Sequence, residues 1–175
     1  LAIVEKFLAS DAKVIIWDKD KEMMSSLNLG DNVHTVEVDV TNFDSVNKAT
    51  EQSLQISNSI DILVNNAYEF SKATGFNDPS GSLEEISKDQ WMKSYESGVY
   101  WHALATQVVI EKLKRQGSGS IINISSMYAI VSPDPKLYEG VDLLNPPSYG
   151  AAKSALIAFT RYTASFYGEY NIRCN

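Results

Sequence analysis

Short apolar segments that alternate with amphipathic helical segments are the feature that most restricts how this chain can fold. Four apolar segments, which lack a strong alternation of polar and apolar residues, are residues 13–17, 34–38, 60–64 and 120–124. Helical patterns cover residues 42–57, 87–115 and 149–167. Strands of this kind occur in parallel sheets that helices cover on both faces. The pattern therefore predicts a single α/β domain over residues 1–175, built on a doubly wound parallel sheet.

Small polar or acidic residues stand where the four predicted strands end. They are Asp18, Asp39, the segment Asn65-Asn66-Ala67 and the pair Ser125-Ser126. Ligands of open parallel sheets bind beyond the carboxyl ends of the strands, so these residues are candidates for a binding site. A carboxylate at the position of Asp18 accepts hydrogen bonds from a ribose hydroxyl and repels a 2′-phosphate, which favours NAD over NADP. The alternative is that such residues only cap the helices that follow them.

Tyr149 and Lys153 stand four residues apart at the start of the predicted helix 149–167. At about 1.5 Å per residue they share one helical face, about 6 Å apart along the axis. A nearby cation favours the phenolate and lowers the pKa of a tyrosine from about 10. The pair therefore predicts a general acid or base that acts on a carbonyl or an alcohol. Tyr68 and Lys72 have the same spacing but lie in a predicted loop, so we interpret that second match as coincidence.

Composition and charge argue against several other classes of protein. The net charge is −7 and no basic stripe is present, so a nucleic-acid partner is not expected. No apolar run approaches the roughly 20 residues of a membrane span, and no signal-peptide pattern opens the chain. A single cysteine, Cys174, and two histidines, His34 and His102, predict a cytoplasmic protein without a metal site. We interpret both histidines as packing or surface residues.

Six segments match, in order, the pattern of a known family. They are the strand that ends in Asp18, Asp39-Val40, Asn65-Asn66-Ala67, residues 122–126, Tyr149-x-x-x-Lys153 and Ile172-Arg173-x-Asn175. On these segments the chain resembles the short-chain dehydrogenase/reductases over essentially its whole length. The resemblance implies a Rossmann-like sheet, a nicotinamide cofactor, and hydride transfer between NAD(H) and a carbonyl or alcohol carbon of a small-molecule substrate.

The resemblance also implies catalytic roles for three residues. Ser126 would hydrogen-bond the substrate oxygen, and Tyr149 would donate or accept the proton. Lys153 would bind the nicotinamide ribose and lower the pKa of Tyr149.

Further residues are assigned to the cofactor by the same resemblance. Asp18 would bind the adenosine ribose, and Asp39 with Val40 would flank the adenine. Asn65 and Ala67 would line the cofactor channel, beside Tyr149 and Lys153.

The segment between Ser126 and Tyr149 is longer than in the commonest short members of the family. It is similar to the branch of flagellin modification protein A, and it would place Tyr138 and Glu139 beside the substrate mouth. A sugar-derived substrate is the expectation. A nucleotide-sugar dehydratase or epimerase is one alternative, since those enzymes also carry a long segment here, and a non-catalytic dinucleotide-binding protein is another.

Two positions inside the chain depart from the family pattern. Tyr68 stands in place of the glycine that ends the family's Asn-Asn-Ala-Gly motif, where it either alters the nicotinamide side or points outward. Gly98 stands where a catalytic asparagine usually holds the water of the proton relay, which puts that relay in doubt. A glycine inside the predicted helix 87–115 costs roughly 1 kcal/mol.

Both ends of the chain also depart from the pattern. The glycine-rich phosphate loop, the first strand, the last strand and the substrate lid are not found between Leu1 and Asn175. The first strand would lie at the sheet centre, between the strands at 13–17 and 60–64. We therefore predict that residues 1–175 are an internal fragment that alone folds poorly, binds NAD weakly and is inactive.

A homodimer or homotetramer is the expectation for the full-length protein, because family members commonly pair their last two long helices between subunits. Three aromatic residues of the predicted helix 149–167 bear on this expectation. Phe159, Tyr162 and Phe166 belong either to the core or to such a subunit contact.

Overall fold

The computed structural model describes residues 1–27, 30–141 and 143–175, and within them five parallel strands form two sheets. The strands are β1 (Val14–Asp18), β2 (Val33–Glu37), β3 (Ile62–Asn65), β4 (Gly119–Asn123) and β5 (Ile172–Cys174). β1 pairs with β2 in one sheet, and β4 lies between β3 and β5 in the other. Four of these strands lie within two residues of the predicted ones. The parallel α/β fold expected from the alternating segments is therefore confirmed.

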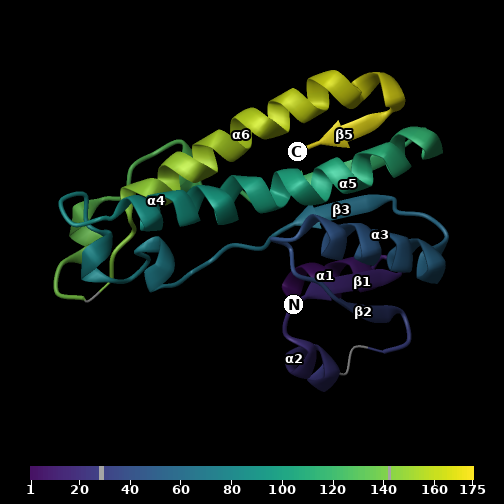
Figure 1. The fold of residues 1–175 in the computed structure, drawn as a ribbon, viewed down its shortest axis with the longest axis horizontal. Helices are drawn as coiled ribbons and strands as arrows, with labels where there is room; N and C mark the ends of the chain where they lie inside the picture. Colours follow the sequence, from purple (N-terminus) through teal and green to yellow (C-terminus); the bar gives the residue numbers. More distant parts are fainter. Residues whose placement is uncertain (28–29, 142) are drawn as a thin grey trace.

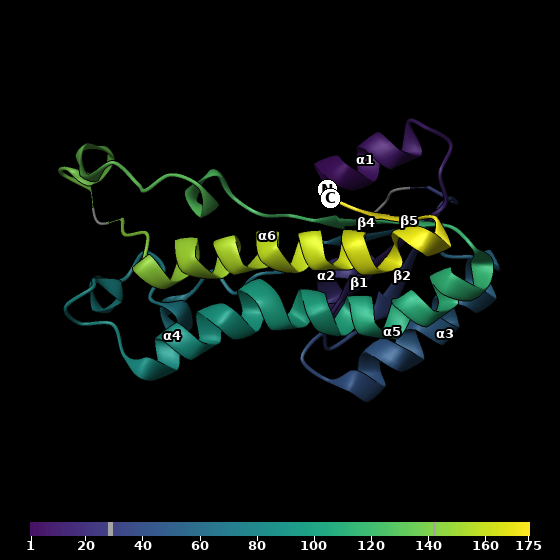
Figure 2. The ribbon, with the colours of Figure 1, turned by 90° about the horizontal axis from the view of Figure 1, so that it is seen from above.

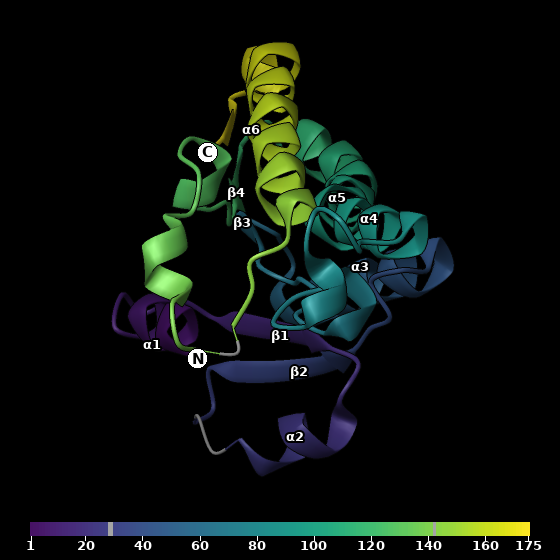
Figure 3. The same ribbon diagram turned by 90° about the vertical axis from the view of Figure 1, so that its left-hand side faces the viewer.

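The helices form layers on the two sides of the sheets (Figures 2 and 3). In chain order they are α1 (Ala2–Leu8), α2 (Lys21–Ser26), α3 (Phe43–Ser57), α4 (Lys88–Tyr95), α5 (Trp101–Gln116) and α6 (Pro147–Tyr167). α3, α5 and α6 cover one face, and α1 lies on the other. Figure 1 shows that α4 and the first turns of α6 project beyond the sheets, at the end where the strands finish. No helix in the described ranges is both long and apolar enough to cross a membrane.

No backbone ladder joins β1 to β3 among the described residues. This is the interruption expected at the sheet centre. Side chains nevertheless unite the two sheets: Val36 of β2, Leu63 of β3 and Ile121 of β4 belong to one buried cluster with residues of α3 and α5. The two halves are thus held together by side-chain packing and not by a continuous sheet.

Local capping signals in the sequence define several helix ends. The side chain of Asn42 accepts a hydrogen bond from the Ser45 amide at the start of α3. Ser87 and Gln90 form a capping box before α4. Gly117 ends α5 with φ +74°, a left-handed conformation that glycine adopts without the Cβ penalty. Residues close in sequence thus fix these helix ends.

One continuous helix was expected over residues 87–115, and the structure corrects this. A π-helical segment, Glu96–Tyr100, separates α4 from α5. Such segments are rare and frequently lie at functional sites. Gly98 lies in this segment, where an added Cβ would stand 2.9 Å from the Cβ of Ala152 on α6. The glycine therefore allows α6 to approach the π segment closely.

The aromatic residues near the end of α6 do not all enter the core. Tyr162 and Phe166 are 52% and 60% exposed, and their rings stack with centroids 4.2 Å apart. Phe159 is half-buried. For Tyr162 and Phe166 the core interpretation is therefore wrong, and the subunit-contact interpretation stays a prediction.

Candidate active site

The first turns of α6 and the end of β4 are tied together by two side chains. The Lys153 Nζ donates to the carbonyl oxygen of Ile124 over 2.8 Å. The Ser125 hydroxyl donates to the carbonyl oxygen of Lys153 over 3.0 Å. Tyr149 lies one turn before Lys153 on the same helix, as their spacing predicts. The candidate catalytic residues therefore gather at the carboxyl ends of the strands.

Lys153 is an unusually buried lysine. Its residue is 2% exposed, and burial lowers the pKa of its ammonium group to about 8. Water solvates a buried charge poorly, which is why desolvation favours the neutral amine. An ammonium has three N–H donors, and the Ile124 carbonyl occupies one of them. Donors thus remain for ribose hydroxyls, so this lysine fits a nicotinamide ribose.

Three aromatic rings cover Tyr149, and we name Tyr68, Phe70 and Phe76 the aromatic cover. The Tyr68 ring meets the Tyr149 ring edge-on, with centroids 5.1 Å apart and an interplanar angle of 84°. The Phe76 and Phe70 centroids lie 5.4 Å and 6.1 Å from that of Tyr149. Tyr149 is only 9% exposed as a result. The cover narrows the approach to its side chain.

Tyr68 points into the molecule, so the alternative that it points outward is wrong. The Lys153 Nζ stands 5.1 Å from the centroid of the Tyr68 ring. A Cβ added at Gly98 would lie 3.2 Å from Cε2 of the same ring. Lys72 is 79% exposed at its side chain and pairs with Asp78, which supports interpreting the spacing of Tyr68 and Lys72 as coincidence.

Ser126 is half-buried just after β4 and caps a short 3₁₀ helix, Met127–Ala129. Its Oγ accepts a hydrogen bond from the Tyr128 amide over 3.2 Å. No hydrogen bond joins it to Tyr149 among the described residues. The serine thus lies at the same strand end as the tyrosine–lysine pair, with its hydroxyl proton still available.

Asn65 was expected to line the cofactor channel, and in the structure its side chain lies in the protein interior. It is 5% exposed, and its Nδ2 donates to Oδ1 of Asn123 over 2.9 Å and to Oγ1 of Thr106 over 3.2 Å. These bonds tie β3 to β4 and to α5. Its donors are thus used inside the protein, whereas Ala67, two residues later, is exposed.

His102 is buried beside the end of β3, which agrees with its interpretation as a packing residue. It is 1% exposed, and its Nε2 lies 2.9 Å from the Ala67 carbonyl oxygen. Its buried Nδ1 has no partner among the residues that the structure describes. Burial, the largest cause, lowers its pKa to about 4, and the Lys153 charge acts in the same direction. The neutral imidazole therefore supports the segment that ends β3.

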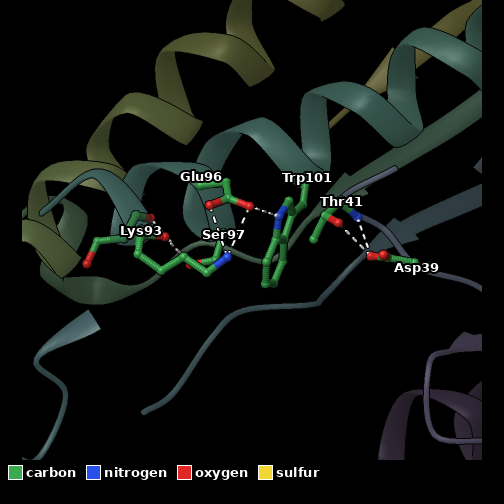
Figure 4. Close-up of polar contacts among 7 residues, drawn as sticks. Asp39, Thr41, Lys93, Glu96, Ser97 and Trp101 are labelled. Carbon is green, nitrogen blue, oxygen red and sulfur yellow. Dashed lines mark hydrogen bonds and ion pairs between the residues drawn. The ribbon is translucent and has the colours of Figure 1, made fainter. Parts of the chain in front are cut away.

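The acidic residues of the first sheet lie at its carboxyl end. One oxygen of Asp18 accepts from the Asp20 amide over 2.9 Å, as the capping alternative expects. Oδ1 of Asp39 accepts from both the amide and the hydroxyl of Thr41, at 2.9 Å and 2.7 Å (Figure 4). The Thr41 hydrogen bonds lower the pKa of Asp39. Among the described residues, each carboxylate keeps one oxygen without a partner, and that oxygen can accept a hydrogen bond from a hydroxyl of an adenosine. Val40 is half-buried beside the core.

A charged cluster spans the end of α4, the π segment and the start of α5, and the sequence patterns did not identify it. Figure 4 shows the side chains of Lys93, Glu96 and Trp101 beside one another, with the pair Asp39 and Thr41 drawn to the right of Trp101. The Lys93 Nζ donates to both Glu96 oxygens at 3.1 Å and 3.0 Å and lies 5.3 Å from the Trp101 ring centroid. The Lys93 charge also helps to lower the pKa of Asp39.

Two further features bear on what can bind. Within the described parts of the chain, no group of three His, Cys, Asp or Glu residues could hold a metal ion. A groove of about 800 Å³ opens between α2, β2 and α3, and of the candidate residues Asp39 alone lines it. The groove therefore lies apart from Tyr149.

Comparison with known proteins agrees with the geometry. The family model described as short chain dehydrogenase matches residues 1–175. A curated relative named "Probable galactose dehydrogenase GalD", from Rhizobium meliloti strain 1021, is 29% identical over 182 residues. That match covers 99% of this chain and 63% of the relative, so the chain spans slightly less than two thirds of it.

Two solved structures show the same fold. A short-chain dehydrogenase from Streptomyces avermitilis superposes with a TM-score of 0.77 at 23% identity, over 98% of this chain and 58% of that one. ElxO, solved with NADP bound, gives a TM-score of 0.81 at 21% identity, over 99% and 65%. At these identities the likeness concerns the fold alone.

Proposed function

Because this chain belongs to the short-chain dehydrogenase family, we propose that it transfers a hydride between NAD(H) and a carbonyl or alcohol carbon of a sugar-derived substrate. The observation that carries the proposal is the tie between α6 and β4. It holds the Lys153 ammonium on the Ile124 carbonyl, one helical turn from Tyr149. The relative named for galactose favours a sugar among possible substrates. Membership of the flagellin modification branch stays a prediction.

Each residue of the site contributes one step to the proposed reaction. Bound NAD supplies the hydride acceptor. The Ser126 hydroxyl donates a hydrogen bond to the substrate oxygen and holds it near Tyr149. The Tyr149 phenol oxygen takes the proton of the alcohol, or returns it to the carbonyl in the reverse direction. Lys153 binds the nicotinamide ribose and holds its ammonium group one helical turn from that phenol.

For the cofactor we propose NAD in preference to NADP. Asp18 and Asp39 place two carboxylates at the ends of neighbouring parallel strands, where a 2′-phosphate would be repelled. Ala67 would line the channel between the two halves of the cofactor, with Asn65 supporting it from inside. ElxO binds NADP, so the preference must be measured.

The decisive experiment uses the protein in its full natural chain. Purified enzyme is incubated with galactose and related sugars and with NAD or NADP, while NADH or NADPH formation is followed by absorbance. We expect turnover with NAD that Tyr149→Phe lowers about 10²–10⁴-fold, because the general acid–base is lost. Tyr162→Phe, a change at an exposed tyrosine of the same helix, serves as the control.

Other outcomes would replace the proposal. Conversion of a nucleotide sugar without net NADH formation would select the dehydratase or epimerase alternative. NAD binding without turnover of any substrate would select a dinucleotide-binding protein. The burial of Tyr149 under the aromatic cover is the observation that favours this last candidate.

We propose in addition that the protein is a cytoplasmic homodimer or homotetramer. The stacked, exposed rings of Tyr162 and Phe166 on α6 give an apolar surface suited to a subunit contact. The single, buried thiol of Cys174 suits a reducing compartment.

A further inference from the structure

Tyr68 fills the space beside Gly98, and the two residues fit each other. An added Cβ at Gly98 would lie 3.2 Å and 3.7 Å from two carbons of the Tyr68 ring, and 2.9 Å from the Ala152 Cβ. These distances leave no room for a side chain at position 98. The ring therefore occupies the place toward which a side chain on the π segment would project.

The same ring contacts both residues of the tyrosine–lysine pair. Its centroid lies 5.1 Å from that of Tyr149, edge-on, and 5.1 Å from the Lys153 Nζ. Edge-to-face ring pairs and cations over ring faces are both attractive arrangements. A single side chain thus limits the rotamers of both neighbours and keeps water from the Lys153 ammonium.

The hydroxyl of Tyr68 does not explain why a tyrosine stands here. It is buried and has no hydrogen-bond partner in the part of the chain that the structure describes, although the hydroxyls of Ser94, Ser97 and Thr74 lie around it. Ser94 is itself paired with Ser148 over 2.8 Å. A buried hydroxyl without a partner lowers stability, so the contribution of Tyr68 comes from its ring.

We propose that the Tyr68 ring is a positioning residue for Tyr149 and Lys153, acting from the space that Gly98 leaves open. The expected effect on turnover rests on the proposed oxidoreductase function. Tyr68 stands where the family pattern has a glycine, so the proposed role is specific to this chain. The ring fixes the direction of the Lys153 ammonium and shields it from water.

The test compares Tyr68→Phe with Tyr68→Leu in the full natural chain. The first readout is the rate at which a water-soluble amine reagent, trinitrobenzene sulfonate, modifies Lys153, followed by peptide mass spectrometry. Tyr68→Phe keeps the ring, so the rate should stay within twofold of the wild type. Tyr68→Leu uncovers the amine, so the rate should rise at least tenfold. Phe76→Leu is the matched control, because Phe76 contacts Tyr149 but is not placed over Lys153.

The second readout is turnover with NAD and the sugar that serves as substrate. We expect Tyr68→Leu to lower kcat at least tenfold, because Tyr149 and Lys153 lose the ring that positions them, and we expect Tyr68→Phe to keep the wild-type kcat. A leucine variant with unchanged Lys153 modification, or with increased modification and unchanged kcat, would overturn the proposal. If the wild type turns over no substrate, the oxidoreductase function fails, and the modification rates alone still decide the role of the ring.

Discussion

At the scale of single residues, two buried bases set the electrostatics of the site. Lys153 and His102 are almost fully buried and both have lowered pKa values, about 8 and about 4, mainly because burial disfavours their charged forms. Near neutral pH, His102 is therefore uncharged while Lys153 is mostly an ammonium. Because the His102 imidazole is uncharged, it does not repel the positive charge of Lys153.

His102 predicts a loss of stability in mild acid. The unfolded histidine titrates near 6.5 and the folded one near 4, so the unfolded state binds more protons between these values. Stability is thus complete above pH 6.5 and falls as the pH drops toward 4, by up to about 3 kcal/mol for the full pKa difference. The charge of Lys153, which faces the ring, adds to this effect.

Urea denaturation at several pH values measures this loss. His102→Gln keeps an amide donor for the Ala67 carbonyl and does not titrate, so its stability should fall less between pH 6.5 and 4. Above pH 7 the difference between the two proteins should be constant. Parallel curves over the whole range would show that His102 does not cause the acid sensitivity.

At the scale of secondary-structure elements, Gly98 in the π segment between α4 and α5 sets how closely α6 approaches that segment. Gly98 meets Ala152 there, whereas a Cβ added at Gly168, at the end of α6, would meet no heavy atom within 4 Å. Gly168 also has an ordinary negative φ. Gly98 is closely packed and Gly168 is not. The same change to alanine should therefore affect the stability of the protein differently at the two positions.

Gly98→Ala should destabilise the protein by about 1–3 kcal/mol, because it overpacks the contact with Ala152. Gly168→Ala should be neutral or slightly stabilising. Ala152→Gly should relieve the Gly98→Ala clash, so that the double variant is more stable than the sum of the single effects by at least about 1 kcal/mol. Denaturant midpoints of the wild type, the two single variants and the double variant measure this coupling. Additive effects would argue against a contact between positions 98 and 152.

The sequence predicts some of these elements much better than others, for physical reasons. Helix starts at Asn42 and Ser87 are predictable because a cap and its amide partner are three residues apart. The π segment is not, because no local signal marks it and the residue that Gly98 meets there, Ala152, is distant in sequence. Gly98 was interpreted as a cost to a regular helix, since single-residue propensity contains no information about a neighbouring helix.

The candidate site shows the same division. The alignment of Tyr149 with Lys153 follows from helical spacing alone and is found in the structure. The inward turn of Tyr68 and the buried bonds of Asn65 depend on residues from several elements, so local patterns could not predict them. The roles assigned to these residues remain proposals.

At the scale of the whole molecule, the exposed rings on α6 predict an assembly that can be disrupted. Replacing both Tyr162 and Phe166 by glutamate should place charges in the proposed subunit contact and reduce the mass in solution to that of one chain. Analytical ultracentrifugation of the full natural chain measures this mass. Ser165→Glu, at an exposed neighbour, is the control, and an unchanged mass in the double variant would exclude this surface.

The separation of the two sheets has a consequence for how the native state opens. Among the described residues, no backbone hydrogen bond connects the β1–β2 sheet with the β3–β4–β5 sheet. Buried side chains of both sheets pack in one cluster with α3 and α5, and a 2.6 Å ion pair between Lys112 and Glu51 joins these two helices. The β1–β2 half is thus able to act as a separate cooperative unit, whose opening leaves the other ladder intact. Its amide protons would then exchange with solvent at a lower free-energy cost than those of β4, which is paired on both sides.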